Sequence, residues 1–228
     1  MSARDAVFAA LRRSLHVSGA EAPRRDIVAA RLANAPSGII PARGQGDRRA
    51  RLATFRAEAQ RVQASVADIA EPRQIPGEIA RYLRENNLPA TLRMGADPAL
   101  RDLPWAETTL DVARGASDGR DLNAVNVAFG AVAETGTLAL ASGPDNPTTL
   151  NFLPDNAIVV LFADRVAGDM ESLFAKLRQS YGKGEAPRTL NFVTGPSRSA
   201  DIEQTLLLGA HGPRRLHIVI VGAQSAPL

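Results

Sequence analysis

The sequence contains no cysteine among its 228 residues. Disulfides, thiolate nucleophiles and iron–sulfur or zinc sites built from this chain's own thiolates are therefore excluded. No apolar run reaches the roughly 18 to 20 residues that span a bilayer, and the N-terminus lacks the compact apolar stretch of a signal peptide. We therefore expect a cytoplasmic protein with no membrane span.

Lysine and aromatic residues are also scarce. Of the 27 basic residues 25 are arginine, and aromatic residues make up only 4% of the chain. Residues 1–60 carry 11 basic and 5 acidic residues, a balance of +6, whereas the other 168 carry 16 and 19, a balance of −3. Because no clustered basic face, stacking positions or nucleic-acid motif accompanies this charge, we favour a codon bias toward arginine and expect no nucleic-acid partner.

The apolar pattern predicts a helical N-terminal arm followed by one larger domain. Residues 2–16 read as a helix in which Ser2 and Asp5 form a capping pair, and 24–33 read as a second helix. A Pro/Gly-rich linker ends near residue 46. We therefore predict an arm and linker over 1–46 and a domain over 47–228.

Within the larger domain, helical and strand patterns alternate. The stripe Leu52, Phe55, Ala59, Val62, Val66 and Ile69 predicts one helix over 47–69. Further helices are predicted near 76–87, 166–177 and 199–208. Strands are predicted at 91–94, 108–112, 124–129, 131–141, 157–162, 189–194 and 215–221. The closing strand–helix–strand order suggests parallel strands with a right-handed crossover, so the predicted class is α/β.

The sequence AETGT at 133–137 interrupts an apolar strand region with polar residues. A plain hairpin turn explains Thr135, Gly136 and Thr137. Glu134 is harder to explain as a turn residue, because a carboxylate flanked by small and apolar residues suits nucleophilic or general-base work in a cleft. Glu134 is therefore a candidate catalytic residue, and the three residues after it are candidate ligand contacts.

The sequence TGPSRSADIE at 194–203 follows a predicted strand and opens a predicted helix. Free amides at a helix start, two hydroxyls and a guanidinium would favour a carboxylate or phosphate. The alternative is structural, with Ser199 a plain N-cap whose helix dipole is complemented by acidic residues. The candidate ligand-binding residues of this stretch are Gly195, Ser197, Arg198, Ser199, Asp201 and Glu203.

The sequence GAHGPR at 209–214 joins the last predicted helix to the last predicted strand. Gly209 suits a helix C-cap. His211 lies in a loop beside the candidate site, either as a catalyst or as a hydrogen-bonding strut, and Arg214 is a further candidate ligand contact. No two histidines have the i, i+4 spacing of a helical metal site, so we expect no metal.

These motifs, in this order and with SGP at 142–144 between them, resemble the lactate utilization protein C family of the LUD (formerly DUF162) group. The resemblance covers roughly residues 47–221 and is weak before Asn123. The family usually has a Leu-Pro-Pro-x-His segment, where this chain has Leu153-Pro154-Asp155-Asn156-Ala157. No role of that histidine can therefore be carried over.

The resemblance implies a NagB/RpiA/CoA-transferase-like layered sheet with helices on both faces. It also implies a part in oxidising L-lactate to pyruvate with partner subunits that hold iron–sulfur clusters, this chain itself holding no cofactor. We expect a subunit that binds a small carboxylate or phosphate. Two alternatives stay open: a stand-alone transferase or isomerase using Glu134, and a non-catalytic assembly protein for the iron–sulfur subunits.

Overall fold

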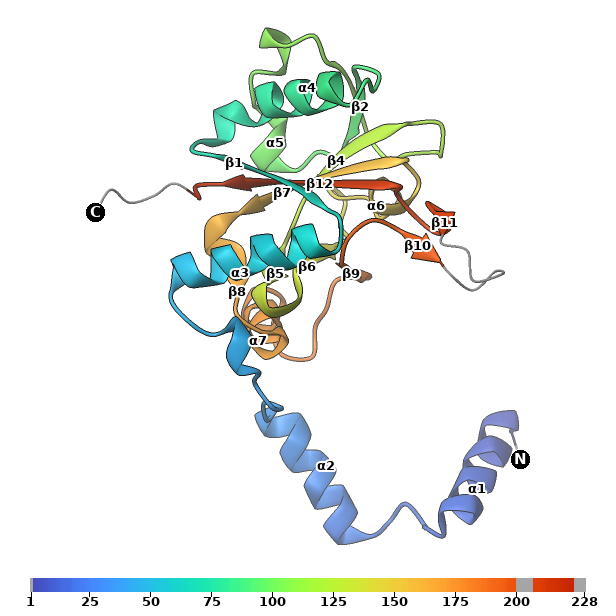
Figure 1. The fold of residues 1–228 in the computed structure, drawn as a ribbon. Coiled ribbons are helices and arrows are strands. Elements are labelled where there is room, and N and C mark those ends of the chain that lie inside the picture. The colour runs from blue at the N-terminus through green and yellow to red at the C-terminus, as the bar shows by residue number, and fades with distance from the viewer. Residues whose placement is uncertain (1, 200–206, 224–228) are drawn as a thin grey trace. The chain divides into compact units, whose positions relative to one another are not determined.

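The computed structural model describes residues 2–199 and 207–223 and divides the chain into two compact units after Ile39 (Figure 1). The first unit holds the predicted helices α1 (Ala3–Leu15) and α2 (Ala22–Asn34). The hydroxyl of Ser2 accepts from the amide of Asp5, whose carboxylate accepts from the amide of Ser2, so the predicted capping pair is confirmed. Neither helix contains a buried residue.

A six-stranded parallel sheet forms the centre of the second unit, in the order β1-β12-β7-β4-β2-β3. Its strands are β1 (Ser65–Ile69), β2 (Thr91–Met94), β3 (Asp111–Arg114), β4 (Asn123–Val127), β7 (Asn156–Phe162) and β12 (Arg215–Val221). The chain runs outward through β2 and β3 and then returns through β4, β7 and β12. The strand order therefore reverses between β2 and β4, the topological switch point of the sheet.

Alternate residues of each central strand face opposite layers, as the period of two requires. In β12, Leu216, Ile218 and Ile220 pack on the side of α3 (Arg48–Arg61). Val219 and Val221 pack on the side of α4 (Ile75–Glu85). Figure 1 shows the two helices on opposite faces of the sheet, which confirms the predicted α/β class with helices on both faces.

A second sheet of four strands lies on the α3 side, in the order β8-β5-β6-β9. Its strands are β5 (Gly130–Val132), β6 (Thr137–Ala141), β8 (Val166–Ala167) and β9 (Leu190–Val193). The other helices of this unit are α5 (Pro98–Arg101), α6 (Thr149–Phe152) and α7 (Met170–Tyr181). Single 3-10 turns are Ala42–Gly44, Pro72–Gln74, Trp105–Glu107, Ala133–Thr135 and Ala163–Arg165. No helix in the described residues is long and apolar enough to cross a membrane.

The predicted single helix over 47–69 is wrong in its second half. Helix α3 ends at Arg61, Gln63 takes a left-handed backbone with φ of 69°, and β1 follows. Val66 and Ile69 then face opposite layers, although the helical stripe would have put them on one face. The parallel hydrogen bonds from β1 to β12 favour the strand, and helical spacing within residues 62–69 cannot reveal them.

The predicted helix over 199–208 is wrong at both described ends. Arg198–Ser199 forms strand β10, which pairs antiparallel with β11 (Leu207–Leu208). Gly209 therefore follows a strand and caps no helix. The predicted parallel pairing of the closing strands is also wrong, because β9 pairs antiparallel with β6 in the second sheet.

Candidate functional site

The Glu-Thr-Gly-Thr sequence forms the 3-10 turn Ala133–Thr135 and its exit between β5 and β6. Gly136 has φ of 65°, and a Cβ there would lie 2.5 Å from the backbone nitrogen of Ala59 in α3. The hydroxyls of Thr135 and Thr137 are 2.7 Å apart, and Thr137 Oγ1 lies 2.8 Å from Thr194 Oγ1. The turn thus supports α3 and meets the second predicted motif at Thr194.

Glu134 is the buried member of this turn, with only 7% of its surface exposed. Its amide donates to the carbonyl of Gly168, and Gly44 packs so closely that a Cβ there would lie 3.0 Å from the Cβ of Glu134. Its Oε2 is buried and has no hydrogen-bond partner among the described residues. The carboxylate therefore points into protein, and its catalytic role stays a prediction.

The loop from Gly195 to Ser199 packs against the C-terminal end of α3. Gly195 has φ of 75°, and a Cβ there would lie 2.5 Å from the carbonyl oxygen of Val62. The guanidinium of Arg198 donates to that same carbonyl. Because Ser199 lies in strand β10, the predicted helix-start amides are not present at this residue.

Ser197 ties this loop to the segment before β12. Its amide donates to the carbonyl of Pro213 at 2.8 Å, and its hydroxyl accepts from the amide of His211 at 3.2 Å. Ser197 and His211 thus meet at the amino end of β12, away from Glu134, which packs on Gly44 and Gly168. The predicted ligand contacts Asp201 and Glu203 lie outside the described residues.

A cavity of about 420 Å³ opens beside this loop, between α4, β1 and β12 at the amino edge of the parallel sheet. Pro196 and Arg214 line it from the predicted motif segments, and Leu208 lines it from β11. The other side chains that matter for its chemistry come from the sheet and α4: Ser65, Arg81, Tyr82, Glu85, Arg215 and His217. Sequence reasoning located Arg214 in this region but not the strand residues opposite.

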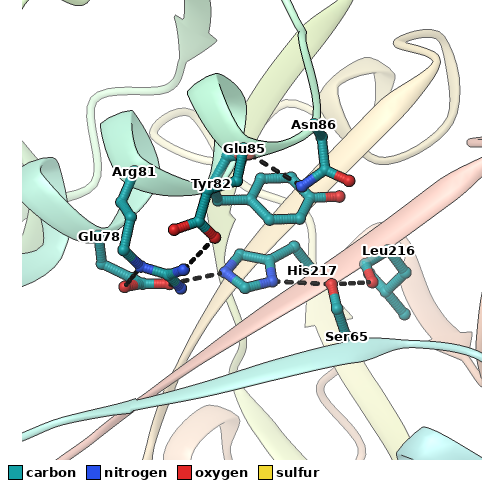
Figure 2. A network of polar contacts seen from close by, with 8 residues as sticks. All are labelled: Ser65, Glu78, Arg81, Tyr82, Glu85, Asn86, Leu216 and His217. Carbon is teal, nitrogen blue, oxygen red and sulfur yellow. Dashed lines mark hydrogen bonds and ion pairs between the residues drawn. The ribbon is translucent and has the colours of Figure 1, made fainter.

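Figure 2 shows a polar network that includes residues of the cavity lining, among them Ser65, Tyr82 and His217. Ser65 Oγ lies 2.8 Å from His217 Nδ1, and His217 Nε2 lies 3.2 Å from Glu78 Oε1. The ring of Tyr82 stacks on the imidazole, with centroids 3.9 Å apart and planes 7° from parallel. The His217 side chain is only 3% exposed, so contacts on its face and on both nitrogens hold the ring.

The charged side chains that α4 contributes to this network are tightly paired with one another. Burial opposes the ionisation of Glu78, but hydrogen bonds from His217 and Arg81 outweigh it and lower the pKa of Glu78 to about 2. Hydrogen bonds to Glu78 and Glu85 raise the pKa of Arg81. Burial raises the pKa of Tyr82, against the effect of Ser65 and the nearby charge of Arg215. Glu78 is therefore a carboxylate at neutral pH.

Arg215 is the cation in this cavity that is free to bind an anion. Its guanidinium contacts the neutral side-chain oxygen of Asn156 at 3.3 Å and forms no ion pair with a described residue. Arg214 reaches Asp155 only at 3.7 Å. Three arginines line the cavity against the single carboxylate of Glu85, so its lining favours an anion.

A second cavity, of about 200 Å³, lies at the carboxyl end of β4, where open α/β sheets usually bind ligands. Asp97 and Asp145 line it together with a single cation, Arg165. That guanidinium donates to the carbonyl of Ala128 and lies 4.7 Å from the ring centroid of Phe162. In this cavity the carboxylates outnumber the cation, which is the reverse of the first cavity. It therefore suits a small anion less well.

Sequence reasoning missed Ser65, Glu78, Arg215 and His217. A signal was present, because Arg215 and His217 are polar residues two apart at the start of an apolar strand and must share a face. Glu78 and Arg81 have the i, i+3 spacing of a helical ion pair. Residues 2–199 and 207–223 contain no group of three or more metal-binding side chains.

The comparisons with known proteins agree with the motif order. The LUD domain family matches residues 124–221. Lactate utilization protein C of Geobacillus sp. (strain WCH70) is 37% identical over 91 residues, 40% of this chain and 38% of that protein. Lactate utilization protein C of Geobacillus kaustophilus (strain HTA426) is 32% identical over 142 residues, 58% of this chain and 59% of that protein. The matches thus span about two to three fifths of these relatives.

A solved structure shows the same fold. The crystal structure of a DUF162 family protein from Deinococcus radiodurans is 23% identical and superposes with a TM-score of 0.58, covering 78% of this chain and all of that one. The α/β layering with helices on both faces that was expected from the resemblance accords with this match and with the central parallel sheet. Residues 124–221 therefore match the LUD domain, and the chain is similar to the lactate utilization protein C family and to a DUF162 family protein.

Proposed function

We propose that this chain acts in lactate utilization by binding a small carboxylate in the cavity at the amino edge of its parallel sheet. The observation that carries the proposal is Arg215, a cation that lines this cavity and forms no ion pair with a described residue. A bidentate guanidinium–carboxylate contact is the natural use of such a group.

The cavity also offers groups for the hydroxyl or keto oxygen of a 2-hydroxy or 2-keto acid. Ser65 is exposed and lines the cavity beside the phenol of Tyr82. A serine hydroxyl both donates and accepts, so it can bond to either oxygen type. Lactate and pyruvate are the probes that this set of groups suggests, with the carboxylate on Arg215.

The assignment to lactate comes from the relatives, which bear the name lactate utilization protein C. We propose that the chain is a cytoplasmic subunit of an L-lactate-oxidising system, in which iron–sulfur clusters belong to partner subunits. In this proposal the chain contributes the anion site and no cofactor of its own.

Isothermal titration calorimetry of the full chain with L-lactate, pyruvate and inorganic phosphate tests the anion site. A charge-assisted hydrogen bond contributes about 1.5 to 3 kcal/mol, so Arg215→Ala should weaken binding by roughly 10- to 150-fold. Arg49→Ala is the matched control, because Arg49 is exposed on α3 and does not line the cavity. Equal affinity of the wild type and a folded Arg215→Ala variant would overturn the proposal.

A further inference from the structure

Three side chains from three different elements form a chain of hydrogen bonds that reaches the exposed hydroxyl of Ser65, which also lies 3.4 Å from the carbonyl oxygen of Leu216. Ser65 begins β1, His217 lies in β12 at the same register position, and Glu78 lies in α4 (Figure 2). We propose that Ser65 is a nucleophile activated by His217, with Glu78 orienting the imidazole, and that the site cleaves carboxylic esters that carry a negative charge. This goes beyond the proposed function, whose anion site it shares.

The proton positions follow from the partners of the imidazole. An ionised carboxylate can only accept a hydrogen bond, and the pKa of Glu78 is about 2, so His217 Nε2 carries the proton. In the neutral imidazole with this tautomer, Nδ1 is the acceptor, and it lies 2.8 Å from Ser65 Oγ. The two ring nitrogens have exchanged the roles they play in the serine protease triad, but the logic of nucleophile, base and orienting carboxylate is the same.

Burial and exposure are distributed as a nucleophilic site requires. The side chains of His217 and Glu78 are 3% and 11% exposed, and the ring of Tyr82 covers one face of the imidazole. Ser65 is exposed and lines a cavity of about 420 Å³, which is large enough for a small ester. A base fixed by packing therefore faces a hydroxyl that a substrate can reach.

The reaction that this arrangement supports needs only water. Ser65 Oγ attacks the ester carbonyl carbon while its proton moves to His217 Nδ1. The ester C–O bond breaks, and the leaving alkoxide takes that proton and departs as an alcohol. Water then attacks the acyl-serine, giving a proton to Nδ1, which returns it to Ser65 as the carboxylic acid leaves. Arg215 holds the anionic group of the substrate.

Labelling of the full chain with a neutral fluorophosphonate probe tests the nucleophile. Intact mass should increase by one adduct, and peptide mapping should place it on Ser65. Ser65→Ala should abolish labelling, whereas Ser180→Ala, a change at an exposed serine of α7, should label as the wild type does. Because a general base contributes roughly 100-fold or more, Glu78→Gln and His217→Gln should slow labelling by at least about tenfold.

Steady-state hydrolysis of 4-nitrophenyl acetate and 4-nitrophenyl hemisuccinate tests the substrate class. The wild type should favour the anionic hemisuccinate in kcat/KM, and Arg215→Ala should remove that preference while still reacting with the neutral probe. A wild-type chain that is labelled on Ser65 but binds neither lactate nor pyruvate would contradict the proposed function alone. An unlabelled wild type, or labelling that proceeds at the wild-type rate in a folded Glu78→Gln variant, would overturn the nucleophile proposal. Thermal melts establish which variants are folded.

Discussion

At the scale of single residues, the glycines and threonines of the predicted motifs serve the packing of α3. Gly136 and Gly195 each allow the backbone of another segment to approach where a Cβ would collide. Thr137 joins the two motif segments through Thr194. Close backbone approach is a structural reason for the two glycines, and the contact between the motif segments is one for Thr137. Neither reason involves a ligand.

Gly136→Ala should be strongly destabilising. The new Cβ would lie 2.5 Å from a helix backbone nitrogen that cannot move aside, and the φ of 65° disfavours any residue with a Cβ. We expect the free energy of unfolding in urea to fall by about 2 kcal/mol or more. Gly143→Ala is the control, since a Cβ there meets nothing within 4 Å. Equal stability of the two variants would contradict this role of Gly136.

Arg215 and His217 illustrate a different kind of residue. Each is a polar side chain at the edge of an apolar strand, and neither belongs to a recognisable motif. Their importance comes from what lies opposite: Ser65 is 152 residues away from His217 in the sequence, and Glu78 is 139 residues away. Sequence spacing carries no information about such partners.

At the scale of elements, the junction between α3 and β1 decides which layer the following residues enter. Gln63 has a left-handed backbone, and its amide donates to the carbonyl of Gln60 at 2.8 Å. This left-handed residue turns the chain out of the helix. Ser65 then starts β1 and faces α4, and the hydroxyl of the proposed nucleophile thereby reaches the cavity.

Replacement of Gln63 by glycine should lower the free energy of unfolding far less than replacement of Gln60 by glycine. A left-handed backbone costs a residue with a Cβ about 1 kcal/mol, whereas glycine inside a helix costs about 1 kcal/mol relative to alanine. Urea unfolding should therefore find Gln63→Gly more stable than Gln60→Gly by about 1 to 2 kcal/mol. The reverse order would mean that the strained turn does not end α3.

The antiparallel pair of β10 and β11 replaces the described ends of a predicted helix for a comparable reason. Arg198 donates to Val62 at the end of α3, and Ser199 of β10 pairs with Leu207 of β11. The capping pattern at Ser199 is a short-range signal, and contacts with a distant segment override it.

At the scale of the whole molecule, the boundary of the larger unit falls before the linker ends. The structure divides the chain after Ile39, whereas the sequence predicts an arm that extends to residue 46. Gly44 is buried against Gly168, and the side-chain amide of Gln45 donates to Asp169 at 2.9 Å. The end of the linker is thus part of the folded unit.

Deletion of residues 1–39 should leave a cooperative thermal transition close to that of the full chain, because neither α1 nor α2 buries a residue. Deletion of residues 1–46 is the matched comparison and should lower the Tm by several degrees. It removes the Gln45 hydrogen bond, worth about 1 kcal/mol, and the Gly44 packing, and each kcal/mol shifts the Tm by roughly 2 to 4 °C. Loss of cooperativity in the shorter deletion would show that the first unit completes the core.

The sequence by itself determined the local elements whose signals are short in range. The apolar runs of β7 and β12, the capping pair of α1 and the start of α4 at a Pro-containing turn all follow from side-chain period and cap chemistry. The motif order also indicated the similarity to LUD-domain proteins, and with it the layered α/β fold.

Only the tertiary structure decided which strands pair and which polar side chains meet. The register between β1 and β12 puts Ser65 beside His217, and α4, packed on that face of the sheet, supplies Glu78 and Tyr82. The same pairing converts the end of a helical stripe into a strand. Strand register and helix docking depend on residues more than a hundred positions apart, whereas propensity, period and capping act over a few residues. The polar cavity therefore could not be predicted from the sequence.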